Sequence, residues 1–421
     1  MKEQQIGFGK AEITPRTNVL LAGYAAERLS TKIHDPLFSK CLVYKDEVSS
    51  FVMIVLDLIS ADETLTKSIL DRLSKYGVTK EELDVQATHT HSGPMGVTNN
   101  LKGALVGFDS VFGVHDEKII NLILDGVENS YLNAVDNLDS YELYKFSTLI
   151  NGVGSNRTDD KLPGDKLLTG FIFKQSNGNN NLLYNYSCHP TVLAADNLEI
   201  SADFPGAVAK QLNEYKEVIF INGSSGDIST RYNRKGKGFA EVERFASIIS
   251  NQIKLNENEA IKQKDKTLKQ IAVPIILNTR IPLSINEATN NIKERKCELD
   301  KIKAENGSAL QAREKKAYLE GANADLMYAK NYQGVKAYTL DCRIINIGKT
   351  RVCCVPVELY SELSNVMKSE DLLFSSYANG YYLYLADIKA HEEHNYEACS
   401  SPFAKGEGEK LVEMLHERIV L

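Results

Sequence analysis

The chain has 421 residues, of which 43% are hydrophobic and 25% are charged, the profile of an ordinary globular protein. A formal net charge of −7 gives no basic surface for nucleic acid, and no apolar stretch is long enough to span a bilayer. The seven cysteines, an odd number that includes adjacent Cys353 and Cys354, argue against a disulfide framework. Residues 1–6 are polar and lack the apolar core of a signal peptide, so we predict a cytoplasmic protein.

The first elements alternate between strand and helix patterns. Residues 6–15 alternate like a strand that stops at a proline. The runs 42–44 and 51–57 predict a hairpin, whose second strand is nearly all apolar and therefore buried on both faces. Helical periodicity follows over 61–76, and a short strand over 83–87.

The same alternation continues to the end of the chain. Helices are expected at 116–135, 206–215, 239–254, 359–368 and 406–418. Strands are expected at 168–174, 182–187, 218–222, 270–283 (as a pair), 336–347 and 351–356. This order predicts an α/β fold with layered mixed β-sheets flanked by helices.

The composition changes between about residues 256 and 332, where lysine and glutamate become frequent. Residues 284–331 carry two charged helical segments, broken near Asn306-Gly307-Ser308. We predict a helical hairpin inserted in a single domain over 1–421. The hairpin would cover a site or provide a dimer contact, and a passive solvated excursion is the alternative.

Two histidines stand two residues apart in residues 87–94, Ala-Thr-His-Thr-His-Ser-Gly-Pro. Side chains at i and i+2 of a strand share a face, so His89 and His91 would project together where Ser-Gly-Pro ends the strand. This arrangement suits a metal ligand beside an acid or base, and the alternative is two surface histidines in a turn. The glycine-rich residues 99–113 predict a mobile loop near such a site.

Further motifs are spread along the chain. In order, they are residues 9–15 (Gly-Lys-Ala-Glu-Ile-Thr-Pro), 34–37 (His-Asp-Pro-Leu), 87–94, Asn156-Arg157, 189–191 (His-Pro-Thr), 201–206 (Ser-Ala-Asp-Phe-Pro-Gly), 226–229 (Gly-Asp-Ile-Ser), Glu358, and the region of Tyr384 and Tyr396. Outside the helical insertion, this ordered series resembles the neutral, non-lysosomal ceramidase family. The resemblance concerns the catalytic domain only, without the family's β-rich C-terminal domain.

The resemblance implies a zinc-dependent amidase that cuts the N-acyl bond of ceramide and holds Zn²⁺ by two histidines, a glutamate and a tyrosine. Matched by motif, these ligands are His89, His189, Glu358 and Tyr384. Tyr381 is a rival for the tyrosine. The residue chemistry agrees, because nitrogen and oxygen ligands with an open position suit zinc and a water molecule. Taken singly, His189 could be a capped core histidine, Glu358 a helix N-terminal carboxylate and Tyr384 a packed ring.

The resemblance also assigns His91, Arg157 and Tyr396 to the stabilisation of negative charge on the carbonyl oxygen. His91 could protonate the leaving amine as well, since its unperturbed pKa is close to neutral. Arg157 in a surface ion pair and Tyr396 as a packed ring are the alternatives. Ser229 matches the family's active-site serine, as nucleophile or positioning group. We favour positioning, because a metal-activated water makes a second nucleophile unnecessary. Asp227 would orient that turn or simply cap it.

The expected function is hydrolysis of the N-acyl amide of ceramide or of a smaller, more soluble ceramide-like molecule. The alternatives are a metal-dependent esterase or lactonase with the same centre, and a non-catalytic zinc-containing binding protein. The chain departs from the family at Met95, Val357 and Thr230-Arg231, which stand where glycines and a proline are expected. The expected partner is a small N-acyl substrate, with no nucleic acid and no transmembrane segment, and a homo-oligomer through the insertion stays open.

Overall fold

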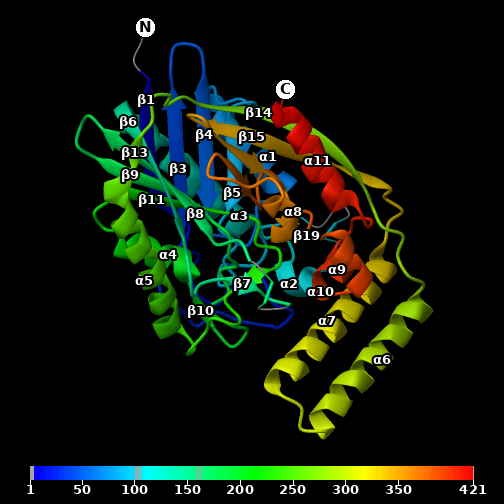
Figure 1. Ribbon diagram of the computed structural model, residues 1–421. Coiled ribbons are helices and arrows are strands. Elements are labelled where there is room, and N and C mark those ends of the chain that lie inside the picture. Colours follow the sequence, from blue (N-terminus) through cyan, green and yellow to red (C-terminus); the bar gives the residue numbers. More distant parts are fainter. Residues whose placement is uncertain (1–3, 100–103, 106, 159–160, 163, 421) are drawn as a thin grey trace.

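The computed structural model describes residues 4–99, 104–105, 107–158, 161–162 and 164–420, and Figure 1 shows their arrangement. In this described part, the first sheet has nine strands. Eight follow the order β11-β9-β8-β6-β1-β3-β4-β5, and β13 pairs with β6. These strands are β1 (Gln5–Glu12), β3 (Phe38–Lys45), β4 (Ser50–Leu56), β5 (Leu83–Ala87), β6 (Asp139–Leu149), β8 (Leu167–Gln175), β9 (Asn180–Tyr186), β11 (Glu217–Asn222) and β13 (Ile261–Lys262). The β4–β5 and β9–β11 pairs are parallel and the others antiparallel, so the sheet is mixed.

A second sheet packs on one face of the first. Its order is β14-β15-β16-β18, formed by β14 (Leu268–Asn278), β15 (Ala337–Ile347), β16 (Thr350–Cys354) and β18 (Leu372–Ser375). The core between the sheets joins Met53 and Phe171 of the first to Ile345 and Val352 of the second. Helices cover the two outer faces: α1 (Glu63–Leu73), α3 (Glu117–Asp136), α4 (Asp203–Gln211) and α5 (Phe239–Asn256) on the first sheet, and α11 (Glu407–Val420) on the second. The predicted class of layered mixed sheets flanked by helices is confirmed.

Strand β4 shows how an apolar run becomes a central strand. Val52 and Ile54 face the core under α1 and α3, whereas Met53 and Val55 face the second sheet. Successive side chains of a strand point to opposite faces, so a strand covered on both sides must be apolar throughout. Each of these buried side chains contributes about 1.5–3 kcal/mol relative to an exposed one.

A helical hairpin of α6 (Ile285–Ala304) and α7 (Ala309–Asn331) extends at the lower right of Figure 1. The two helices agree with the two charged segments expected there. Each begins with a capping box, in which the side chains of residues 284 and 287, or of 308 and 311, bond reciprocally to backbone N–H groups. Helix α7 packs against α10 (Tyr396–Ser400), where Gly321 lies so close that an added Cβ would be 3.2 Å from the Tyr396 Cα. Among the described helices, none is long and apolar enough to cross a membrane.

Several predicted bounds were wrong. The helix expected at 206–215 is α4, which begins at Asp203 and ends at Gln211. The strand pair expected at 270–283 is the single strand β14, because its partner β15 lies beyond the hairpin. The helix expected at 359–368 is reduced to α8 (Ser361–Asn365). The loop expected at 99–113 contains the short helix α2 (Asp109–Phe112), and residues 100–103 and 106 within it lie outside the described part.

Residues 375–379 join the two edge strands of the first sheet. The Ser376 N–H donates to the Asn222 carbonyl at the end of β11 (2.9 Å), and the Asn379 N–H donates to the Val85 carbonyl in β5 (2.7 Å). Asn222 Nδ2 donates to the Thr88 carbonyl (3.3 Å). The loops that follow β5, β9 and β11 therefore meet at one place, which is where open α/β sheets commonly bind ligands.

Candidate metal centre

His89 follows β5 and has an unusual backbone. Its φ is +70°, in the left-handed region that few side chains adopt without a compensating contact. The His89 N–H donates to the Leu58 carbonyl (2.9 Å), and the ring stacks on Tyr377 with centroids 4.0 Å apart. Nδ1 lies 2.7 Å from the Ile59 carbonyl oxygen. A carbonyl can only accept, so Nδ1 carries the proton and the Nε2 lone pair is free.

His189 follows β9 and is held in the same way. Its N–H donates to the Ile228 carbonyl (3.0 Å), and its Nδ1 lies 2.5 Å from the Ser225 carbonyl oxygen. The ring is fully buried. The Nδ1–H is again committed to a backbone acceptor, so Nε2 offers a lone pair, the tautomer that a metal-binding histidine uses.

Glu358 faces both imidazoles from the short strand β17 (Glu358–Leu359). Its Oε2 lies 2.9 Å from Nε2 of His189 and 3.4 Å from Nε2 of His89. Its Oε1 accepts from the Tyr381 hydroxyl (2.5 Å), and the Tyr377 hydroxyl lies 3.4 Å from Oε2. Burial opposes ionisation of Glu358, and positive charge on the side of the two imidazoles is what holds the carboxyl pKa well below its usual range.

The chemistry of this donor set fits a bound cation. Two Nε2 lone pairs face one carboxylate, and with both protons on Nδ1 no hydrogen lies between these acceptors. Acceptors this close repel unless a proton or a metal ion lies between them. Imidazole nitrogen and carboxylate oxygen are ligands of Zn²⁺. The residues present therefore fit a metal ion at this point.

His91 completes a cluster of three buried imidazoles. Its Nε2 lies 3.2 Å from Nε2 of His89, and one ring nitrogen from each of His89, His91 and His189 falls within 4.8 Å of the others. Its Nδ1 is buried and makes no hydrogen bond to a described residue. The backbone of Gly23 lies against this ring, since an added Cβ would be 2.2 Å from Nδ1. This group of histidines could hold a metal, with His91 either as a further ligand or beside the ion.

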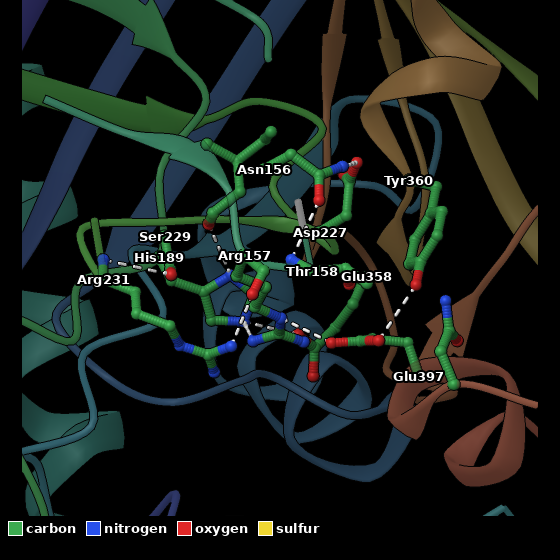
Figure 2. A network of polar contacts seen from close by, with 12 residues as sticks. Asn156, Arg157, Thr158, His189, Asp227, Ser229, Arg231, Glu358, Tyr360 and Glu397 are labelled. Atoms are coloured by element: carbon green, nitrogen blue, oxygen red, sulfur yellow. Dashed lines mark hydrogen bonds and ion pairs between the residues drawn. The ribbon is translucent and has the colours of Figure 1, made fainter. Parts of the chain in front are cut away.

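Arg157 lies next to this cluster, as Figure 2 shows. Its Nη1 is 3.4 Å from Nε2 of His189, and its Nε donates to Oε1 of Glu397 (2.6 Å). The second Glu397 oxygen accepts from the Tyr360 hydroxyl (3.0 Å). Because both charged groups are buried, each is stabilised by the opposite charge of the other. The carboxylate of Glu397 therefore fixes the arginine beside the imidazoles.

Tyr384 and Tyr396 form the wall on the far side of Arg157. Their rings meet edge to face with centroids 5.8 Å apart, and the guanidinium carbon lies 5.3 Å from the Tyr384 centroid. Tyr384 is in register with Glu358 between the parallel strands β19 (Tyr384–Leu385) and β17. The structure thus brings both tyrosines to the centre. Tyr381 reaches Glu358 by a hydrogen bond, so it stays a rival for the fourth ligand.

Ser229 and Asp227 occupy the turn before Arg231 (Figure 2). Ser229 lies in β12 (Ile228–Ser229), and its hydroxyl accepts from the Arg231 N–H (3.3 Å). Asp227 accepts from Asn156 Nδ2 (2.9 Å) and from both the N–H and the hydroxyl of Ser361 (2.7 and 2.9 Å). Asp227 therefore ties the loop that carries Arg157 to the segment that follows Glu358.

A small recess, with a volume of about 30 Å³, opens onto these groups. Its floor includes His89, His91 and Glu358, and one wall is apolar. That wall is formed by Ile59, Phe108, Val111, Phe112 and Leu383. A larger depression on the second sheet shares none of these residues. The recess combines an apolar wall with convergent polar groups, the usual character of a small-molecule site.

The structure brings the eight residues singled out from the sequence into one neighbourhood, although Ser229 is joined to it through Arg231 and Arg157. It also adds residues that the sequence reasoning missed. Glu397 is the most informative, because a buried arginine predicts an acidic partner, and this glutamate directly follows Tyr396. Tyr377 had no signal of its own, since only the path of residues 375–379 places it under His89.

The fold and the site define a layered α/β protein with a buried candidate metal centre at the end of its sheet. Residues 4–226 match the model of the family described as neutral/alkaline non-lysosomal ceramidase, N-terminal. The match covers more than half of the chain, so the chain belongs to this family.

Known proteins extend this comparison. Neutral ceramidase 1 of Arabidopsis thaliana is 25% identical over 235 residues, 51% of this chain and 30% of that protein. The neutral ceramidase of Pseudomonas aeruginosa is 31% identical over 161 residues, 37% of this chain and 23% of that protein. These matches span less than a third of either relative. The crystal structure of the Pseudomonas aeruginosa enzyme superposes with a TM-score of 0.72 at 19% identity, over 99% of this chain and 75% of that one, which shows a shared fold.

Proposed function

We propose that this protein is a zinc-dependent amidohydrolase that cleaves the N-acyl amide bond of ceramide or of a smaller, ceramide-like substrate. One observation carries the proposal. Nε2 of His89 and of His189 face the Glu358 carboxylate, while both Nδ1–H groups are held by backbone carbonyls. Family membership and the names of the relatives support the N-acyl substrate class.

In this proposal, His89, His189 and Glu358 hold the metal, with Tyr384 as the fourth ligand. Zinc bound there would act as a Lewis acid and lower the pKa of a water molecule toward neutrality. The carbonyls of Ile59 and Ser225 keep both imidazole rings oriented, as second-layer partners of metal ligands commonly do.

The neighbouring residues would transfer a proton to the leaving nitrogen and stabilise the negative charge that develops on the carbonyl oxygen. His91 would accept a proton on one ring nitrogen and pass it to the leaving nitrogen of the substrate. Arg157, fixed by Glu397, would donate N–H bonds to the oxygen on which negative charge develops, and the Tyr396 hydroxyl would assist. Ser229 would position the turn beside Arg157.

An assay of matched amides and esters tests this proposal. Purified protein should hydrolyse N-hexanoyl ethanolamine, lose this activity with a chelator and regain it with zinc. Faster cleavage of the matched ester with little amide cleavage would favour the esterase or lactonase alternative. Zinc binding without cleavage of either would favour the non-catalytic binding protein.

The organisation and location of the protein are further parts of the proposal. We place it in the cytoplasm, and seven free cysteines, six of them buried, are compatible with a reducing compartment. We treat residues 1–421 as one catalytic domain with residues 284–331 inserted. Helix α7 packs on α10, which carries Tyr396, so the hairpin supports a wall of the site, and its outer face is the place we propose for a contact between copies.

A further inference from the structure

Two arginines in the turn after β12 lack an acidic partner. Arg231 donates through Nη1 to the Arg157 carbonyl, and Arg234 donates to the Thr230 hydroxyl (3.0 Å) and the Thr191 carbonyl (2.8 Å). Both side chains are partly buried. Neither pairs with a carboxylate among the residues that the structure describes. A partly buried cation without a counter-ion is costly, and such a group is common where an anionic ligand binds.

Arg231 is two contacts away from the candidate metal centre. Its guanidinium is bonded to the backbone of Arg157, whose own guanidinium lies 3.4 Å from Nε2 of His189. Figure 2 shows the Arg231 side chain running beneath Arg157 on the His189 side of the cluster. The apolar recess is lined by His91 and Phe112 and does not include Arg231 among its lining residues. The imidazole cluster therefore borders the recess through His89 and His91, while Arg231 lies at the backbone of Arg157.

The arginines near the centre differ in their pairing. Glu397 pairs with Arg157 (2.6 Å), and Glu320 of α7 pairs with Arg313 (2.9 Å). Arg231 makes no ion pair with a described carboxylate, although Glu397 attracts it at longer range. Burial, followed by the repulsion of Arg313 and Arg157, lowers the pKa of Arg231 to about 10. An anionic group on a ligand would relieve this repulsion and accept charge-assisted hydrogen bonds from a planar guanidinium.

We propose that the natural substrate carries an anionic group on the amine side of its amide, bound by Arg231 with support from Arg234, while the acyl chain lies along the apolar recess. This substrate class is an N-acyl amino acid or an N-acyl aminosulfonate, distinct from a neutral N-acyl alcohol such as ceramide. The inference rests on the proposed amidohydrolase function. It adds to that function that the substrate carries a negative charge on the amine side of its amide.

Matched substrates test the proposal. N-hexanoyl glycine, N-hexanoyl taurine and the neutral N-hexanoyl glycinamide share one acyl chain and differ in the amine side. Wild-type protein should show a kcat/KM about tenfold to a hundredfold higher for an anionic substrate than for the neutral one, the worth of a charge-assisted hydrogen bond. The kcat/KM values for N-hexanoyl glycine and N-hexanoyl taurine show whether a carboxylate or a sulfonate is preferred. The KM of the anionic substrate should rise with added NaCl and that of the neutral one should not.

Three variants assign the preference to Arg231. Arg231→Gln should remove the preference for the anionic substrate mainly through its KM and should lower kcat equally for the glycine and glycinamide substrates, because the bond to the Arg157 carbonyl is lost. Arg231→Lys should restore part of the preference. Arg295→Gln removes an arginine from α6 and should leave the preference intact. Equal kcat/KM for charged and neutral substrates in wild-type protein, or a preference that survives Arg231→Gln, would overturn the inference.

A binding measurement separates failure of this inference from failure of the proposed function. Calorimetric titration with N-hexanoyl glycine and with N-hexanoyl glycinamide needs no turnover. If no amide is cleaved, the amidohydrolase proposal fails, and tighter binding of the glycine derivative that Arg231→Gln abolishes would still support the anion site. Equal Kd values for both ligands would contradict the anion site even in an active enzyme.

Discussion

Charged side chains have different surroundings in the α6–α7 hairpin and at the candidate metal centre. In the hairpin most of them pair on the surface, as Arg295 does with Glu298 (3.2 Å), and the buried Asp325 of α7, paired with Arg280 (2.6 Å), is an exception. At the centre, Arg157 and Glu397 are buried and lie 240 residues apart in the sequence. Exposed pairs contribute roughly 0–1 kcal/mol, whereas breaking a buried pair costs about 3–5 kcal/mol. Substitution of an exposed charge of the hairpin should therefore cost little stability, whereas substitution of a buried charge at the centre should cost much.

The largest contrast should come from the two histidines of residues 87–94. His89→Ala should lose both the bound metal and the activity, because it removes a proposed ligand. His91→Ala should keep the metal and lower kcat by about 10²–10⁴, the usual contribution of a general acid–base group. Elemental analysis for zinc and steady-state kinetics measure the two effects.

The hairpin provides the control for this pair. Lys316→Gln, in an exposed pair with Glu320 (3.6 Å), should change neither zinc content nor kcat. If His91→Ala loses the metal and His89→Ala retains it, the two histidine roles are reversed. If both lose it, all three histidines hold the ion.

Substitution of the acidic residue in a buried pair and in an exposed pair should show that the buried pair contributes more to the free energy of unfolding. Glu397→Gln leaves the buried Arg157 without a counter-charge and should lower the free energy of unfolding by about 3–5 kcal/mol. It should also lower kcat, since Arg157 would lose its fixed orientation. Glu298→Gln on α6 should cost at most about 0.5 kcal/mol. Urea denaturation of both variants gives the comparison, and equal losses would remove the distinction between the two regions.

The same contrast explains how much the sequence could predict. The hairpin helices follow from local signals, namely the capping residues Ser284 and Ser308 and the break near residue 306, and both helices were predicted. The paired histidines and the motif series predicted the candidate site residues. Local patterns missed Glu397 and Tyr377, whose partners are far away in the chain. The strand pair at 270–283 failed for the same reason, because β14 pairs with β15 across the whole hairpin.

The pH dependence of stability should have opposite signs in the two regions. Burial raises the pKa of Asp227 from 3.8 to about 7, against the three hydrogen bonds that favour its ionised form. The folded state then binds this proton more tightly than the unfolded state. Stability should therefore fall as pH rises from about 4 to about 7, by at most about 1.4 kcal/mol per pH unit. Asp227→Asn should remove that decline, as measured by urea denaturation at several pH values.

Glu287 in the hairpin gives the opposite case. Hydrogen bonds from the Ser284 side chain and backbone lower the pKa of this carboxyl. Its contribution is therefore present above the unfolded pKa and is lost as pH falls through the lower folded value. Glu287→Gln should therefore lower the free energy of unfolding at neutral pH and leave it unchanged below the lower folded pKa. A shallower loss at acid pH in Asp227→Asn than in wild-type protein would contradict the raised pKa.

The last comparison concerns two glycines that share a left-handed backbone. Gly23 (φ +96°) lies against His91, and Gly334 (φ +74°), just after α7, has nothing within 4 Å of an added Cβ. Alanine at either position should cost about 1–3 kcal/mol through backbone strain alone. Only Gly23→Ala should also impair catalysis, because its Cβ would be 2.2 Å from Nδ1 of His91 and the ring would have to move. A displacement near 1 Å at a catalytic group can cost about 10²-fold in rate. Gly334→Ala should therefore unfold at a lower urea concentration with kcat unchanged, and Gly23→Ala should lose both. Equal kcat values in the two variants would show that His91 tolerates movement, and its assignment as the proton-transfer group would then fail.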